Sequence, residues 1–293
     1  MMSVHIRNFG MTADSKEVHL YTLESVSGMR VSVTDLGGML QEVSVPDGKG
    51  GFIDVALGYD GASGYLRFGG SLGAIIGRNA NRIAGASFDL GGTTHRLTDN
   101  DGENNIHSGP HVWRKRLWDV AEDPKDDPDG GASITFGLVS RDGDQGFPGA
   151  ADVRATYTLH PDWRLELALE AQVTKTTIVN LTSHAYWNLN GHASGSVLRH
   201  SFSLDADAYT PVGKGLIPTG EIAPVEGTPY DLRESTNFEN RLYALPDGLD
   251  TNFVLKNDER LEKVATLVGD ETGISMDLYT DAPGNLTDRK SVV

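Results

Sequence analysis

Three parts of the 293-residue sequence place histidine, arginine, asparagine or aspartate among apolar or small neighbours. They are residues 77–83 with 104–109, residues 180–189, and residues 248–253. A polar group that is buried without a hydrogen-bond partner costs about 1–3 kcal/mol, so an apolar core tends to exclude such residues. A ligand with many hydroxyl groups would use them. These segments therefore predict a site for a polyhydroxylated ligand.

Each candidate residue also has a simpler structural interpretation. A single histidine in an apolar strand, such as His107 or His184, is often a hydrogen-bonded core residue. Arg82 could form a structural ion pair, and Asp250 could cap a turn. The residue types alone leave the choice between chemistry and structure open.

The elements that must position these residues are short β-strands. Between Arg164 and Val173 the odd positions are apolar and the even positions mostly polar, which is typical of a strand with one face in a core. The same alternation occurs at residues 134–138, 153–159 and 274–278. His160-Pro161-Asp162 joins two of these runs as a hairpin turn. No amphipathic pattern extends beyond two or three helical turns.

Glycine punctuates these strands, at 35 residues of 293. Glycine pairs between short apolar runs indicate turns that need a positive φ. The pattern predicts an all-β protein, a sandwich or barrel, with residues 1–293 in a single domain. We expect an exposed loop from Glu122 to Gly131 and a glycine-rich turn at residues 142–146. We interpret Arg114-Lys115-Arg116 as a solvated strand edge.

Composition excludes several classes of function. Without cysteine there is no disulfide, thiolate nucleophile or cysteine-ligated metal. The 25 Lys and Arg against 41 Asp and Glu give a net charge of −16, which disfavours binding to nucleic acid or to anionic lipid. No apolar run approaches the ~18 residues of a membrane helix, and the N-terminus lacks the pattern of a signal peptide. We expect a soluble, cytoplasmic protein.

Seven motifs of the sequence occur in the order typical of one family. They are Gly77–Ile83, Asn105–Gly109, Asp142–Gly149, Asn180–Leu189, Ile217–Glu221, Gly227–Asp231 and Leu249–Phe253. On these motifs the chain resembles the aldose 1-epimerases, or galactose mutarotases, from about Gly28 to Gly284. The resemblance implies a large antiparallel β-sandwich that interconverts the α and β anomers of free aldohexoses such as galactose and glucose. It implies no metal and no organic cofactor.

The resemblance also implies roles for individual residues. The implied catalytic residues are His184, the proton donor to the ring oxygen, and His107. Residues that match the family's sugar-binding positions are Asn81, Arg82, His107, His184, Tyr186 and Asp250. Trp113 and Trp187 could stack on the sugar or belong to the core. The expected partner is a small aldose, and the expected assembly is a monomer or a homodimer.

The sequence departs from the family after Gly284. The family has a Gln-x-Tyr-Thr stretch there and later a glutamate that acts as general base, and residues 285–293 match neither. A truncated or frame-shifted product, a non-catalytic carbohydrate-binding protein, and a base role for Asp250 or Glu221 stay open as explanations. Missing strands would leave edges exposed, which predicts reduced stability or an oligomer that covers them. A sugar phosphate as substrate is a weaker alternative, because no phosphate-binding cluster is evident.

Overall fold

The computed structural model of the chain describes residues 4–126, 130–242, 245 and 248–288. The chain forms two compact units, Met1–Trp187 and Asn188–Val293, each with its own sheets. The organisation of residues 1–293 as a single domain stays a prediction.

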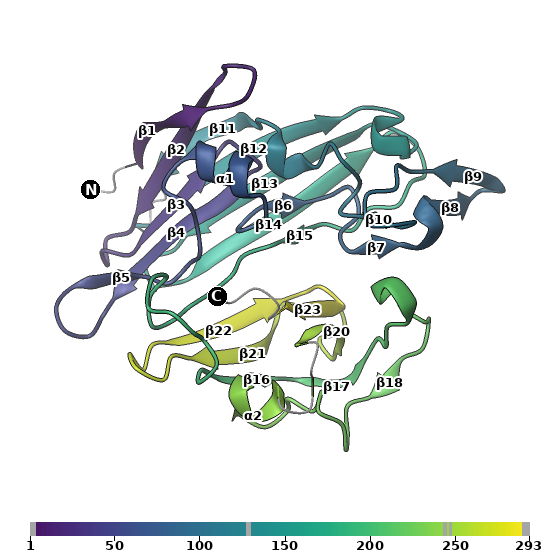
Figure 1. Cartoon of the computed structure of the whole chain (residues 1–293). Coiled ribbons are helices and arrows are strands. Elements are labelled where there is room, and N and C mark those ends of the chain that lie inside the picture. The colour runs from purple at the N-terminus through teal and green to yellow at the C-terminus, as the bar shows by residue number, and fades with distance from the viewer. Residues whose placement is uncertain (1–3, 127–129, 243–244, 246–247, 289–293) are drawn as a thin grey trace. The chain divides into compact units, whose positions relative to one another are not determined.

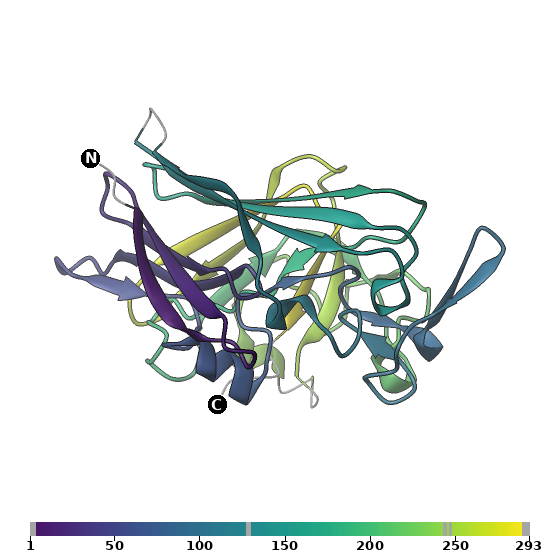
Figure 2. The same cartoon turned by 90° about the horizontal axis from the view of Figure 1, so that it is seen from above.

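Two antiparallel sheets dominate the first unit (Figure 1, Figure 2). One contains β1 (Val4–Met11), β2 (Glu17–Glu24), β3 (Arg30–Thr34), β4 (Met39–Pro46) and β5 (Phe52–Asp54), and the other contains β11 (Asp119–Asp126), β12 (Ala132–Ser140), β13 (Ala151–Leu159) and β14 (Leu165–Val173). Inward-facing aromatic residues join the sheets. The ring of Tyr21 meets the ring of Phe136 edge to face at 5.5 Å. The buried Tyr157 hydroxyl donates a hydrogen bond of 2.7 Å to the carbonyl of Gly38.

Short elements between and after these sheets carry the candidate site. They are α1 (Ala62–Phe68), β6 (Ile75–Ile76), β7 (Arg82–Ile83), η1 (Ala84–Ala86), β8 (Ser87–Leu90), β9 (Thr93–Arg96), β10 (Asn105–Ile106), η2 (Trp113–Lys115), η3 (Asp144–Gly146) and β15 (Thr182–Ser183). Two pairings matter for function. Strand β7 pairs with β10, and β6 pairs with β15, both antiparallel. Each pairing brings together segments that lie apart in the sequence.

The second unit also contains two antiparallel sheets, drawn in green and yellow in Figure 1. Its elements are β16 (Ser201–Leu204), β17 (Ala206–Tyr209), η4 (Lys214–Leu216), β18 (Ala223–Pro224), β19 (Thr236–Asn237), α2 (Phe238–Leu242), β20 (Asp250–Leu255), β21 (Glu262–Val268), β22 (Ser275–Thr280) and β23 (Gly284–Asp288). A core forms where apolar side chains of β16, β17, β20 and β21 meet, with Phe202, Leu204 and Phe253 among its buried members. Alternate residues of these strands face that core, as the pleat requires.

The structure confirms the all-β antiparallel fold and the strands predicted at residues 134–138, 153–159 and 165–173. The hairpin turn is also present, since the His160 N–H donates to the carbonyl of Arg164. Strand β14 differs in burial from the prediction. Its odd positions are only half-buried, and Val173 is exposed, because β14 is the edge strand of its sheet.

Two local predictions were wrong. Residues 122–126, expected in a loop, belong to β11, whose irregular pairing with β12 satisfies the backbone of a polar edge strand. Residues 127–129 of that predicted loop lie outside the described part of the chain. The basic run Arg114-Lys115-Arg116 is not a strand edge, because its first two residues belong to the 3₁₀ turn η2. Arg114 and Arg116 are half-buried rather than solvated.

The helices are short, as predicted, with seven residues in α1 and five in α2. Within the described ranges, no helix has the length and apolar character needed to cross a membrane.

Candidate functional site

His107 and Asn81 are tied together through their backbones. The His107 N–H donates to the Asn81 carbonyl at 3.1 Å, and the Asn81 N–H donates to Nδ1 of the His107 ring, also at 3.1 Å. Both residues have positive φ angles, 51° for His107 and 62° for Asn81. A positive φ costs a non-glycine residue free energy, so the surrounding hydrogen bonds must hold it in this conformation. The β7–β10 pairing supplies that support.

The hydrogen bond from Asn81 decides the protonation of His107. Because Nδ1 accepts a backbone N–H, it carries no proton, and the neutral ring must carry its proton on Nε2. Burial, together with the positive charges of neighbouring side chains, lowers the pKa of His107 to about 4. At neutral pH His107 is therefore an uncharged ring that offers one N–H.

His184 lies beside His107. Its backbone is fixed in two directions, because its N–H donates to Ala74 and its carbonyl accepts from Gly73. The two imidazole rings meet edge to face, with 5.4 Å between their centroids at an angle of 87°. The ring of Tyr186, two residues further on, lies 5.2 Å from that of His184. All three residues are half-buried, so each keeps part of its surface exposed.

Arg82 forms an ion pair, as one of the sequence interpretations proposed. Its Nε donates to Oδ2 of Asp101 at 2.7 Å. Among the described residues, no partner contacts its two terminal nitrogens. The guanidinium is thus held in place by one carboxylate and keeps a two-nitrogen fork for other acceptors.

Arg78, in the same motif, has a structural role. Its side chain is 1% exposed, and its guanidinium donates to the carbonyls of Pro148 and Gly149 and to the Oγ of Ser140. Phe147 lies against the guanidinium, 5.7 Å from its central carbon. Arg78 therefore fixes the glycine-rich turn at residues 142–149.

The remaining candidates divide between the two units. Trp113 is 1% exposed and packs against Trp118 and Gly77, so it is a core residue. Trp187 is half-buried. Asp250 begins β20 in the second unit and is half-buried there. The structure therefore brings Asn81, Arg82, His107, His184 and Tyr186 together within one unit, while a sugar-binding role for Asp250 stays a prediction.

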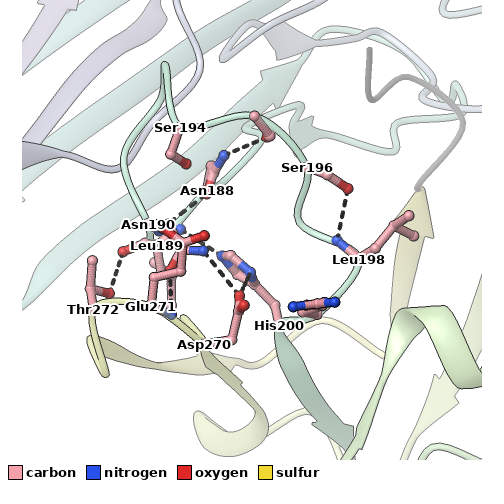
Figure 3. A network of polar contacts seen from close by, with 12 residues as sticks. Asn188, Leu189, Asn190, Ser194, Ser196, Leu198, His200, Asp270, Glu271 and Thr272 are labelled. Carbon is pink, nitrogen blue, oxygen red and sulfur yellow. Dashed lines mark hydrogen bonds and ion pairs between the residues drawn. The ribbon is translucent and has the colours of Figure 1, made fainter.

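Sequence reasoning missed a third histidine, His200, which is fully buried in the second unit (Figure 3). The Leu189 N–H donates to its Nε2 at 3.0 Å, so its proton must lie on Nδ1. That Nδ1 lies 3.2 Å from Oδ1 of Asp270, at an angle outside good hydrogen-bond geometry. Asp270 also accepts from the side chain of Asn190. Both contacts of His200 span long sequence separations, so no local signal marks it.

This geometry suits recognition of hydroxyl groups combined with transfer of a proton. The cluster in the first unit offers an N–H of His107, the guanidinium fork of Arg82 and the second imidazole of His184. Within the described ranges, no group of three or more His, Asp and Glu residues is arranged to hold a metal ion.

Comparison with known proteins gives consistent relatives. Galactose mutarotase of Sus scrofa is 37% identical over 286 residues, which cover 97% of this chain and 81% of that protein. Aldose 1-epimerase of Escherichia coli K12 is 34% identical over 280 residues, covering 93% of this chain and 79% of that protein. The crystal structure of galactose 1-epimerase from Lactobacillus acidophilus superposes with a TM-score of 0.81 at 28% identity, covering 92% of this chain and 78% of the other.

The family description agrees with these relatives and with the site. The sequence model of the family described as Aldose 1-epimerase matches residues 19–286, which include every motif named above. The match extends over both units of the structure. The chain therefore belongs to the aldose 1-epimerase family.

Proposed function

We propose that the protein is an aldose 1-epimerase, which interconverts the α and β anomers of free aldohexoses such as galactose and glucose. The observation that carries the proposal is the imidazole pair of His107 and His184, 5.4 Å apart in a chain of this family. Because the chain belongs to this family, we interpret the pair as catalytic and not as purely structural.

The reaction needs two proton transfers. A base takes the proton of the anomeric hydroxyl while an acid protonates the ring oxygen, so the ring opens, the C1–C2 bond rotates, and the ring closes on the other face. Positioned proton transfer of this kind gives about 10²–10⁴-fold acceleration. A histidine has an ordinary pKa close to neutrality, which suits this exchange. We assign the acid role to His184.

The other residues bind and orient the sugar. His107 offers only its Nε2–H at neutral pH, because Nδ1 is occupied by the Asn81 N–H. It therefore donates a hydrogen bond to the sugar and does not supply the transferred proton. The free terminal nitrogens of Arg82 match two neighbouring hydroxyls. Tyr186, beside His184, adds an aromatic edge to the site.

The family resemblance implies a carboxylate as the base at the anomeric hydroxyl. Sequence reasoning named Asp250 and Glu221. Glu221 is exposed and follows a turn at Thr219, whereas Asp250 is half-buried at the start of β20. A half-buried carboxylate is better suited to proton abstraction, since less water screens it. We therefore assign the base role, or a contact with the ring hydroxyls, to Asp250.

Polarimetry tests the function directly. Freshly dissolved α-galactose is mixed with the purified protein, and the rotation is followed against a buffer blank. We expect a decay faster than in buffer and proportional to protein concentration. A decay equal to that of buffer, with galactose binding still seen by calorimetry, would support the alternative of a non-catalytic sugar-binding protein. No acceleration and no binding would reject both.

We further propose that a small aldose is the partner, that the protein is cytoplasmic, and that it is a monomer or homodimer. Light scattering coupled to gel filtration measures the assembly, with a mass near 31.5 kDa or twice that value expected. A larger assembly would contradict this part of the proposal.

A further inference from the structure

Four arginines in or close to the motifs of the first unit are at least half-buried, and three of them donate hydrogen bonds to acceptors in the described chain. Arg78 donates to backbone carbonyls and Ser140, and Arg82 pairs with Asp101. Arg116 forms a two-pronged pair with Asp144, with distances of 2.7 and 2.9 Å. The fourth, Arg114, contacts no carboxylate and makes no side-chain hydrogen bond within the part of the chain that the structure describes.

Arg114 is half-buried, so this lack of a partner is unusual. A charge that leaves water without a compensating group is costly, and proteins therefore pair such charges. Burial lowers the pKa of Arg114, which is the direction expected for a cation without an opposite charge nearby. Its guanidinium nitrogens are not among the fully buried unpartnered atoms of the described residues, so they keep some exposure to solvent.

Two lines of contact place the backbone of Arg114 near the segments that carry the imidazole pair. A Cβ added to Gly37 would lie 2.7 Å from the Arg114 Cα, and the carbonyl of Gly37 accepts from Ile75. Ile75 in turn pairs with Ser183, the residue before His184.

The second line runs through Trp113, the residue before Arg114 in the same turn. Trp113 packs so closely on Gly77 that a Cβ there would lie 2.1 Å from its ring. Gly77 opens the motif that ends in Asn81 and Arg82. In addition, the positive charge of Arg114 acts on His107 strongly enough to lower its pKa.

The charges around His107 do not balance. Among the groups that act most on His107, the side chains of His184, Arg82 and Arg114 lower its pKa and only the carboxylate of Asp101 raises it. Asp101 is paired with Arg82, so the charge of Arg114 is left without a carboxylate. A carboxylate carries one negative charge and matches the planar fork of a guanidinium, whereas a phosphate monoester carries almost two. One uncompensated guanidinium therefore favours a carboxylate.

We propose that Arg114 binds the carboxylate of a hexuronic acid, so that the substrates of this site include aldoses carrying an acid group, such as galacturonate. The inference rests on the proposed function for its substrate chemistry. It gives Arg114 a role in choosing the substrate, in addition to the residues already assigned to the reaction.

The test compares sugars and variants. Anomer exchange of galacturonate, galactose 6-phosphate and galactose is measured by NMR with wild-type protein, Arg114→Gln and Lys115→Gln. Lys115 is the matched control because it is an exposed cation in the same turn. We expect Arg114→Gln to lower the ratio of kcat/KM for galacturonate to that for galactose by at least about tenfold. Lys115→Gln should leave the ratio unchanged.

Three results would overturn the inference. They are an unchanged ratio in Arg114→Gln, an equal fall in Lys115→Gln, and a stronger preference for the 6-phosphate than for galacturonate. If galactose is interconverted but the ratio does not respond, the inference fails and the proposed function stands. If no sugar is interconverted, calorimetry with galacturonate decides: binding that Arg114→Gln weakens supports the inference, and absent or unaffected binding rejects it.

Discussion

His107 and His200 are both neutral imidazoles fixed by a backbone N–H, and they differ in what their second nitrogen meets. In His107 the backbone holds Nδ1, and the other nitrogen keeps its proton on a half-buried ring beside His184. In His200 the backbone holds Nε2, and the other nitrogen faces Asp270 in a fully buried setting. His107 therefore keeps one ring nitrogen available to a ligand, whereas both ring nitrogens of His200 face groups of the protein.

The difference also has an electrostatic side. Burial and, to a smaller extent, positive neighbours lower the pKa of His107, and Asp101 only partly opposes them. Burial lowers the pKa of His200 as well, although Asp270 and Glu271 act in the opposite direction. A partner carboxylate thus marks the structural histidine, and surplus positive charge marks the one at the site.

The largest effect is expected from substitution of His184, which lies beside His107, whereas Asp270 lies beside His200. We expect His184→Asn to lower kcat/KM for galactose by about 10²–10⁴-fold, because the acid at the ring oxygen is lost. Polarimetry measures the rate, and thermal unfolding checks the fold. His111→Asn, at an exposed histidine, is the control. Activity within twofold of wild type would remove His184 from the mechanism.

Truncation of His200 should instead affect stability. His200→Ala leaves the buried Leu189 N–H without an acceptor and creates a cavity, which together cost about 3 kcal/mol. In His200→Gln the amide oxygen can take the place of Nε2, so we expect a smaller loss. Urea unfolding measures both variants. Equal losses in the two would show that the hydrogen bond to Leu189 is not what matters.

The pH dependence of stability tests the neutral state of His107. Its pKa is 6.5 in the unfolded chain and about 4 in the folded one, so the unfolded chain binds more protons between these values. Stability is therefore full above pH 6.5 and falls as the pH drops toward 4. The contribution lost between pH 7 and pH 5 is about 2 kcal/mol. Urea unfolding of wild type and His107→Gln at both pH values checks this, and identical slopes would contradict it.

The smallest effect is expected at Asp270. Asp270→Asn removes the charge that faces His200 but keeps an oxygen to accept from Asn190, so we expect a loss of about 1 kcal/mol. Glu259→Gln, at an exposed carboxylate, serves as the control. If Asp270→Asn lost as much stability as His200→Ala, the charge of Asp270 and not the hydrogen bond of His200 would be the main stabilising contribution of this network.

Much of the fold could be predicted because strand alternation is local. The runs that became β12, β13 and β14 and the turn at residues 160–162 are visible within a few residues. The half-burial of β14 could not be predicted, since it depends on which strand ends up at the sheet edge. Strand β11 could not be predicted either, because its sequence is polar like that of a loop and only the pairing with β12 makes it a strand.

The site shows the same limit. The motifs identified His107 and His184, but only the fold shows that Nδ1 of His107 is occupied. Arg82 had two interpretations, a structural ion pair or a sugar-binding residue. The structure shows the ion pair with Asp101 and leaves the two terminal nitrogens of Arg82 for a ligand. His200 escaped notice because its contacts are with residues 11 and 70 positions away. Arg114 was hidden in a basic run whose three members have different surroundings.

The bond from Asn81 to His107 has one more consequence. A ring nitrogen can coordinate a transition metal or attack an electrophile only through its lone pair, and in His107 that pair is already engaged by the main chain. To react with His107, an acylating reagent or a chelated metal ion would first have to break the hydrogen bond from Asn81. His107 itself is thereby protected against capture by trace zinc or copper, while its N–H stays available to sugar.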